Sequence, residues 1–374
     1  MRGHPSQQVS MLGMVNLETR VPADHPLRPV KQLVDQTLAE LDPVFERMYA
    51  GGGRSSIPPE RLLKALLLMA LFSIRSERLF CEQLAYNMLF LWFLDMQLSE
   101  QPFDATTFTK NRQRFEEHDV LRRFFEVVVE RARRDNLLSS DQFSVDGTLI
   151  EAWGSNKSFR LRDEEGYDPR AFAQFRGEKR SNETHESKTD PDSKLYRKGN
   201  GQPAKLSHMA HILVENDNGL VVDAEVTAAT GTAEREAALT MLQRQMKRRA
   251  GRTAQKRARR KSPGSKKRRS RPSLAADKAY DTRDFIRQCR SLGVTPHVAS
   301  KRRHSAVDRR TTRHAAYRQS QRARLLTEKV FGWTKAPGRC RRSRFRGRPA
   351  TSQSILIAFT AHNIIRIAKL NASA

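Results

Sequence analysis

The first third of the chain carries apolar residues at helical spacing. Leu62–Phe72 is apolar on nearly every side and follows two prolines that suit the first turn of a helix, so it predicts a central buried helix. Further helices are expected over residues 76–94, 105–117 and 120–137. Residues 1–55 are weakly patterned, and the three glycines near their end indicate a flexible break. Short links between the helices predict an all-helical N-terminal domain over residues 1–137.

From residue 138 onward the pattern changes to strands that alternate with helices. Strands are expected at residues 142–153, 206–216, 220–229, 273–277 and 294–299, and helices at 234–248, 282–292, 322–335 and 353–370. The second and third strands meet at Asp217-Asn218-Gly219, a sequence typical of a tight hairpin. This order predicts an α/β domain with a mixed sheet over residues 138–374. Residues 154–205 interrupt it as a long polar excursion without predicted elements.

Basic residues are concentrated in two regions. The chain has 69 Lys and Arg against 41 Asp and Glu, a net charge of +28. Residues 247–271 carry fourteen of the cations and no acid, and residues 301–348 carry seventeen with two acids, so these regions account for the whole excess. The charge indicates a polyanionic partner, most commonly nucleic acid, and the lack of interleaved apolar anchors disfavours a membrane surface. The low-complexity tract 247–271 predicts a disordered segment, either a DNA tether or an enlarged surface loop.

Segments for membrane insertion or secretion are not predicted. The apolar run Leu62–Phe72 is too short for a bilayer and contains Lys64, and Met1–Ser10 lacks the apolar block of a signal peptide. The three cysteines are odd in number and scattered, so they form neither a disulfide framework nor a metal-ligand spacing. We therefore expect a cytoplasmic protein, associated with the nucleoid if its partner is DNA.

Three acidic residues stand in or at the ends of predicted elements. Asp146 lies in the first strand, Asp277 ends a later strand, and Glu328 lies on the helix Arg322–Lys335. Such residues can converge at the edge of an open α/β sheet, where these sheets bind their ligands. Clustered carboxylates raise one another's pKa, whereas hard cations such as Mg²⁺ prefer carboxylate oxygens. Each acid alone is equally well explained as a helix cap, a turn residue or half of a surface ion pair.

The helix predicted over Arg322–Lys335 has two different faces. Arg324, Glu328 and Lys335 fall within about 40° of one another when successive residues are turned by 100°. The apolar residues lie on the opposite side of the same helix: Leu326, Val330 and Trp333. This pattern predicts a helix that buries one face and presents a carboxylate between two cations on the other. An ordinary surface pair between residues four apart remains the alternative.

The helix predicted over residues 105–117 carries cations behind a polar start. These candidate DNA-binding residues are Lys110, Arg112 and Arg114. A recognition helix that enters a DNA groove has this character. A solvated helix face with ordinary charges explains the residues equally well, so both interpretations stay open.

The combination of motifs resembles the DDE transposases of bacterial insertion sequences. The motifs are VDGT at Asp146, DKAYD at Asp277, and Arg-x3-Glu-x6-Lys from Arg324 through Glu328 to Lys335. Other segments resemble the family too: RSERLFCEQLAYN, FTKNRQRF, LYRKGNGQPAK, NGLVV and TGTAEREAAL. The resemblance runs from about Ser56 to Leu370. One position departs from the family's Tyr-x2-Arg-x3-Glu-x6-Lys signature, because Gln321 stands where the tyrosine would be.

The resemblance implies an RNase H-like catalytic domain that acts on DNA. In it, Asp146, Asp277 and Glu328 would bind two Mg²⁺ or Mn²⁺ ions, and Arg324 and Lys335 would contact transposon-end DNA. The implied reactions are cleavage at terminal inverted repeats and strand transfer into target DNA, by a homo-oligomer in a synaptic complex. Two alternatives stay open: a catalytically idle DNA-binding relative, and a metal-dependent nuclease without strand transfer.

Overall fold

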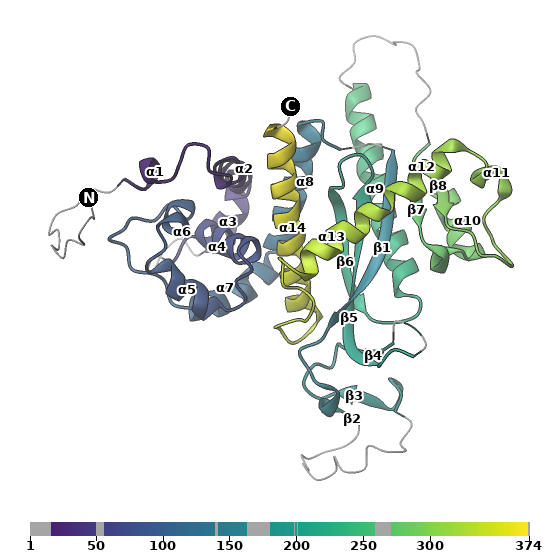
Figure 1. Cartoon of the computed structure of the whole chain (residues 1–374), viewed down its shortest axis with the longest axis horizontal. Helices are drawn as coiled ribbons and strands as arrows, with labels where there is room; N and C mark the ends of the chain where they lie inside the picture. The colour runs from purple at the N-terminus through teal and green to yellow at the C-terminus, as the bar shows by residue number, and fades with distance from the viewer. Residues whose placement is uncertain are drawn as a thin grey trace, which may run out of the picture.

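In the computed structural model, a group of helices packs beside an α/β unit, and the long helix α14 stands between them (Figure 1). The structure describes residues 16–49, 56–138, 141–162, 180–197, 199, 201–258 and 271–372. A mixed sheet preceded by an all-helical segment confirms the predicted fold class. None of the helices within these ranges is long and apolar enough to cross a bilayer.

The described N-terminal residues form helices α1 to α8. Their bounds are α1 (Leu17–Arg20), α2 (Leu27–Ala39), α3 (Asp42–Met48), α4 (Pro59–Leu71), α5 (Glu77–Leu84), α6 (Met88–Phe93), α7 (Thr106–Glu117) and α8 (Val120–Arg134). Helices α1 to α3 were missed because α1 has only four residues and prolines lie within α2 and α3. The single helix expected over 76–94 is instead α5 and α6, because the Asn87 side chain accepts from the amides of Leu89 (3.0 Å) and Phe90 (3.2 Å) and so starts a new helix. The three glycines of the expected flexible break lie outside the described residues.

Helix α4 is the centre of the helical core, as its all-round apolar sequence predicted. Leu62, Leu63 and Leu68 are fully buried in it. Lys64 on the same helix is also buried, and its ammonium pairs with Asp35 of α2 at 2.5 Å and with Asp95. The cation is therefore compensated where it enters the core, as a buried charge must be.

The sheet has the RNase H-like arrangement. Its strands are β1 (Gln142–Glu151), β4 (Lys194–Tyr196), β5 (Lys205–Glu215), β6 (Val221–Ala228), β7 (Ser273–Ala276) and β8 (Thr295–Val298). Antiparallel β5 lies on one side of β1 and pairs in turn with β6, while parallel β7 lies on the other side of β1 and pairs with β8. The predicted hairpin joins β5 to β6, and Gly219 supplies the positive φ of 72° that its turn requires.

The polar excursion contains elements that the sequence did not predict. Strands β2 (Phe159–Leu161) and β3 (His185–Ser187) form a small antiparallel sheet after the short helix η1 (Asn156–Ser158), and β4 joins the edge of β5. Buried Asp190 attaches this region to the rest of the domain, since its carboxylate contacts His208 Nε2 and accepts from the amide of Gly347, each at 3.1 Å. The excursion is therefore structured where it is described, and residues 163–179 lie outside the description.

Helices cover both faces of the sheet. They are α9 (Ala233–Ala258), α10 (Arg283–Ser291), α11 (Arg309–Thr312), α12 (Ala315–Ala323), α13 (Leu325–Lys335) and α14 (Arg348–Ala372). Helix α9 continues past the expected end at residue 248 and so includes the first part of the tract that was expected to be disordered. Arg248 pairs with Glu126 of α8, and Arg249 pairs with Asp141 at 2.6 Å, so distant acids compensate the self-repulsion of the tract. Residues 259–270 lie outside the description.

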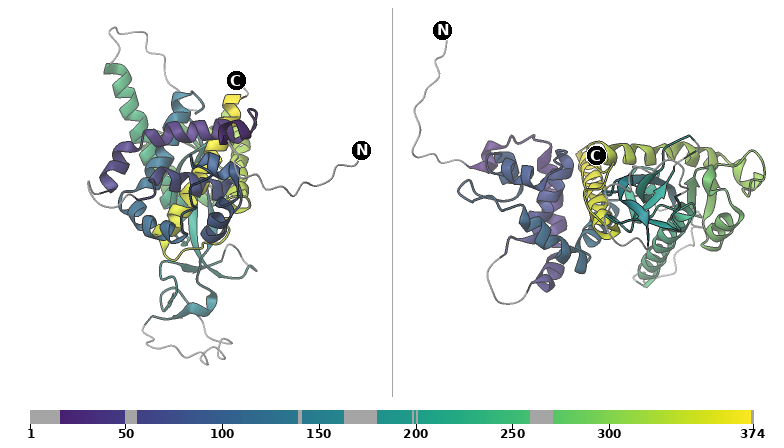
Figure 2. Two further views of the ribbon diagram at one scale, coloured as in Figure 1. Left: turned by 90° about the vertical axis from the view of Figure 1, so that its left-hand side faces the viewer. Right: turned by 90° about the horizontal axis from the view of Figure 1, so that it is seen from below.

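Helix α14 belongs to both hydrophobic cores. Ile364 and Ile367 are buried among the N-terminal helices, whereas Ile355 and Phe359 are buried against the sheet. In two orthogonal views α14 and α8 stand between the two halves (Figures 1 and 2). The helical half and the α/β half are thus joined by a shared, buried helix rather than by a linker alone.

Candidate active site

Asp146 lies in the middle strand of the sheet, where partners on both sides fix β1. Its half-buried carboxylate accepts from the amide of Gly147 at 2.8 Å and from Thr327 Oγ1 at 3.3 Å. Burial raises the pKa of Asp146, and the nearby charge of Asp277 raises it further, while the charge of Arg324 opposes the rise. The two aspartates therefore share one electrostatic environment.

Asp277 directly follows β7, the parallel neighbour of β1. Ser144 pairs with Ala275 in the register, and each aspartate lies two residues beyond that pair, so both occupy equivalent positions on adjacent strands. The Asp277 side chain accepts from the amide of Ala279 at 2.8 Å and begins the short helix η3 (Lys278–Tyr280). The parallel pairing of β1 and β7 therefore brings Asp146 and Asp277 close together, as the sequence predicted.

Gln321 occupies the position where the family signature has a tyrosine. Its amide group donates to the carbonyl of Ala276 at 3.3 Å and to the carbonyl of His297, at the ends of β7 and β8. Because Ala276 immediately precedes Asp277, this contact helps to fix the strand end that carries the second aspartate. Tyr317, one turn earlier, donates to the carbonyl of Val298 at 3.1 Å and so supports β8 instead.

Glu328 reaches the site on helix α13, but its own side chain is exposed. The single helix expected over Arg322–Lys335 is divided at Arg324 into α12 and α13. Helix α13 packs on β1, and Thr327 of this helix contacts Asp146. Thr327 is the residue before Glu328. Within the described ranges, no three His, Cys, Asp or Glu side chains lie close enough to hold a metal ion together. The structure therefore brings the two aspartates together, whereas Glu328 lies on α13 with its side chain exposed to solvent.

The cations predicted beside Glu328 lie at different places. No ion pair joins Arg324 to Glu328 in the part of the chain that the structure describes, and the charge of Arg324 acts on Asp146 instead. Lys335 is the last residue of α13. The predicted buried face is present, since Val330 is buried, Leu326 packs against the sheet core and Trp333 packs against the helical core.

Behind Asp146, the wall of the site consists of residues that sequence reasoning did not single out. A Cβ atom on Gly147 would lie 2.9 Å from Glu234 Cγ and 3.1 Å from His211 Nδ1, so any larger residue here would force a neighbouring group to shift. Burial lowers the pKa of His211 to about 4, and its Nε2 lies 2.8 Å from Thr227 Oγ1. A glycine inside a strand marks close approach of another group and was the available signal.

The candidate DNA-binding residues of α7 have separate environments. Lys110 is exposed. Arg112 pairs with Glu77 of α5, and its guanidinium lies 4.2 Å from the ring centre of Phe345. Arg114 lies 4.6 Å from the ring centre of Tyr49. Two of the three cations therefore contact other elements of the protein, and one faces solvent.

Asp146 and Asp277 lie close together on the RNase H-like sheet, and Glu328 lies on α13, the helix that packs against β1. A family model described as "Transposase DDE domain" matches residues 140–364, and one described as "Transposase domain (DUF772)" matches residues 15–114. The chain therefore belongs to the DDE transposases, as its motifs indicated.

Solved transposase structures share low identity with this chain. A piggyBac transposase synaptic complex with hairpin DNA is 12% identical, with 95% of this chain and 77% of that chain covered and a TM-score of 0.44. A pre-cleavage Mos1 transpososome is 12% identical, with 87% and 82% covered and a TM-score of 0.21. A Mos1 mariner paired end complex with Mn is 12% identical, with 92% and 90% covered and a TM-score of 0.21. No curated protein matches the chain.

Proposed function

We propose that this transposase cleaves DNA at transposon ends and joins the freed ends to target DNA, with Asp146, Asp277 and Glu328 as its acidic triad. The observation that carries the proposal is the placement of Asp146 and Asp277 at equivalent positions of adjacent parallel strands. Burial raises the pKa of Asp146 and the nearby charge of Asp277 raises it further, so a bound cation would favour the charged form of both carboxylates.

The two aspartates fit a hard divalent cation such as Mg²⁺ or Mn²⁺. Both offer carboxylate oxygens, and Mg²⁺ is commonly held by one or two carboxylates together with waters and substrate phosphates. When bound, two such ions would activate the attacking oxygen and stabilise the charge on the phosphate. The exposed Glu328 would complete the set once DNA covers α13, since its neighbour Thr327 already contacts Asp146.

The protein's own groups would orient the DNA around these acids. The positive charge of Arg324 acts on Asp146 and opposes the rise of its pKa, so Arg324 lies near the acids. The same guanidinium can bind a phosphate beside the scissile bond. Lys335 would contact the strand farther along α13. We further propose that two such chains act together on paired transposon ends in a synaptic complex.

The test is a strand-transfer assay with purified full-length protein, a duplex carrying the element's terminal repeats, a supercoiled target plasmid, and Mg²⁺ or Mn²⁺. Asp146→Asn, Asp277→Asn and Glu328→Gln should each abolish both cleaved ends and joined products while end-DNA binding persists. The matched control is Asp284→Asn on α10, whose carboxylate is exposed and pairs with Arg287 at 2.5 Å. Joining by Asp146→Asn would contradict the proposal, and cleavage without joining by the unmodified protein would identify a nuclease.

A further inference from the structure

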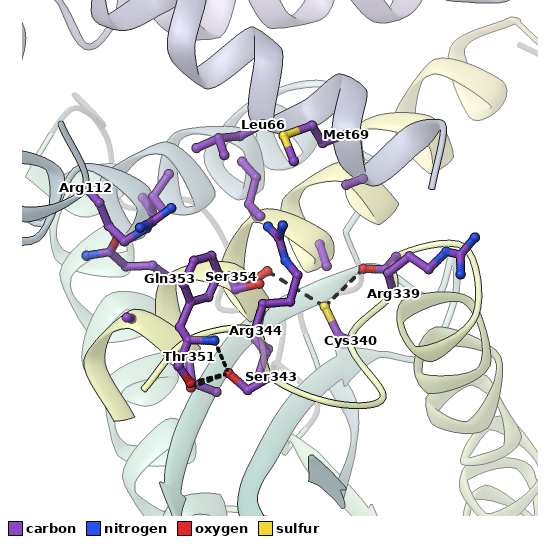
Figure 3. Close-up of a pocket in the computed structure, with 18 of the residues that line it drawn as sticks. Leu66, Met69, Arg112, Arg339, Cys340, Ser343, Arg344, Thr351, Gln353 and Ser354 are labelled. Atoms are coloured by element: carbon purple, nitrogen blue, oxygen red, sulfur yellow. Dashed lines mark hydrogen bonds between the residues drawn. The ribbon is translucent and has the colours of Figure 1, made fainter. Parts of the chain in front are cut away.

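A cavity lies where the N-terminal helices meet the C-terminal segment that precedes α14 (Figure 3). It has a volume of about 70 Å³ and is walled by apolar residues of α4, α7 and α14, among them Leu66, Met69 and Ile355. The side chain of Arg344 extends across it toward Leu66 and Met69 of α4 (Figure 3).

Five arginines line this cavity: Arg75, Arg112, Arg339, Arg342 and Arg344. Glu77 pairs with Arg112. The guanidinium groups of Arg112 and Arg344 lie 4.2 Å and 5.0 Å from the ring centre of Phe345. These five cations outnumber the carboxylate of Glu77, so the cavity carries an excess of positive charge.

Arg344 is half-buried, as Arg112 is, but it lacks the ion pair that compensates Arg112. In the described residues Arg344 has no hydrogen-bond or ion-pair partner, and its guanidinium lies over the ring of Phe345. Burial lowers the pKa of Arg344, and the charges of Arg112 and Arg75 lower it further, against the opposing effect of Glu77. A desolvated guanidinium with unused donors beside other guanidiniums is stabilised by an anion with several acceptor oxygens.

We infer that this cavity binds a phosphodiester group of DNA, held by Arg344 and Arg112 and approached past Arg75, which is exposed. Guanidinium groups match the geometry of phosphate oxygens and bind them in pairs. The inference rests on the proposed function, because the DNA in question is the transposon end. It places one backbone contact at the junction of the helical half and the catalytic half.

The surroundings favour a polymer over a single free phosphate. Exposed arginines continue through the segment before α14 and into its first residue: Arg339, Arg341, Arg342, Arg346 and Arg348. A chain of phosphates can meet these residues in succession, whereas a free phosphate would occupy the cavity alone. Backbone contacts of this kind position DNA and carry no sequence information.

The test compares Arg344→Gln with Arg287→Gln, an arginine on α10 whose side chain is 79% exposed and remote from the cavity. Binding of an end duplex is measured at several salt concentrations, and thermal unfolding is measured without ligand and with inorganic phosphate. Arg344→Gln should bind the duplex about tenfold more weakly, with a salt slope reduced by about 0.9, while Arg287→Gln binds as the unmodified protein does. Without DNA, Arg344→Gln should unfold at the same or a higher temperature, because it relieves repulsion among the arginines.

A second variant keeps the inference testable if Arg344→Gln fails to fold. Glu77→Gln removes the one competing carboxylate and should strengthen duplex binding. Unchanged duplex binding in both variants would overturn the inference, as would a lowered unfolding temperature of Arg344→Gln, which would assign Arg344 a structural role. Stabilisation by inorganic phosphate that depends on Arg344, with duplex binding unaffected, would assign the cavity to a small anion. Failure of the unmodified protein to bind any end duplex would instead refute the proposed function.

Discussion

Replacing Gly147 with alanine would place a methyl group against the rear wall of the candidate active site. The new Cβ would lie 2.9 Å from Glu234 Cγ, 3.0 Å from Glu234 Oε1 and 3.1 Å from His211 Nδ1. Overpacking of this kind costs about 1–3 kcal/mol in the free energy of unfolding. Because His211 is fully buried, the relief must come from Glu234 or from β1 itself, and a shift of β1 would displace Asp146.

The assay is urea unfolding, followed by strand transfer under conditions where the variant is folded. Gly147→Ala should lose about 1–3 kcal/mol of stability and lose joining activity beyond what unfolding explains. A matched control is Gly332→Ala on α13, where a Cβ meets nothing within 4 Å. That change should stabilise the protein by about 0.5–1 kcal/mol, because alanine is the better helix former.

Combining Gly147→Ala with Glu234→Ala identifies the source of the cost. Glu234→Ala removes the atom that the new methyl group would strike, so the double variant should recover part of the lost stability. Coupling of about 0.5–3 kcal/mol is typical of residues in contact. The packing interpretation is refuted if Gly147→Ala is as stable as the unmodified protein, or if its loss and that of Glu234→Ala simply add.

Three more changes test other contacts. Burial lowers the pKa of His211 from 6.5 to about 4, so the unfolded chain takes up a proton at a higher pH than the folded protein does. The free energy of unfolding should therefore fall by roughly 3 kcal/mol as the pH falls from 6.5 to about 4. In thermal scans at pH 4 to 7, His211→Gln should show a weaker dependence on acid. Thr327→Val removes the 3.3 Å contact to Asp146 and should slow joining by about two- to tenfold while end-DNA binding is unchanged, as binding and single-turnover assays would show. Asp281→Ala deprives the amides of Lys301 and Ala306 of their 2.8 Å acceptor and should cost about 1.5–3 kcal/mol in urea unfolding, whereas an unchanged midpoint would contradict this role.

Local patterns predicted the elements that depend on nearby residues. Helix α4 followed from its apolar run, and the β5–β6 hairpin followed from a turn that needs Gly219 at positive φ. Asp146 was placed within β1 and Asp277 at the end of β7, because the apolar residues of both strands were recognisable in the sequence. The resemblance to a family then supplied the roles expected of these acids and of Glu328.

The features that were missed depend on residues far apart in the sequence. Helix α9 extends into the basic tract because Arg248 meets Glu126, a residue of α8 that no local pattern links to it. The close approach of Glu234 to Gly147 likewise arises only when α9 lies on the sheet. Arg112 is a candidate DNA contact by sequence, and its partners Glu77 and Phe345 became visible only in the folded chain.

The position of α14 has a consequence for the protein during its synthesis. The ribosome makes this helix after every other described element, yet Ile364 and Ile367 fill the helical core and Phe359 fills the sheet core. Until α14 emerges, the apolar faces of α4 and α8 stay exposed to water, and neither half can complete its core. A chain that ends before α14 therefore lacks part of both cores, and neither half is expected to fold stably without this helix.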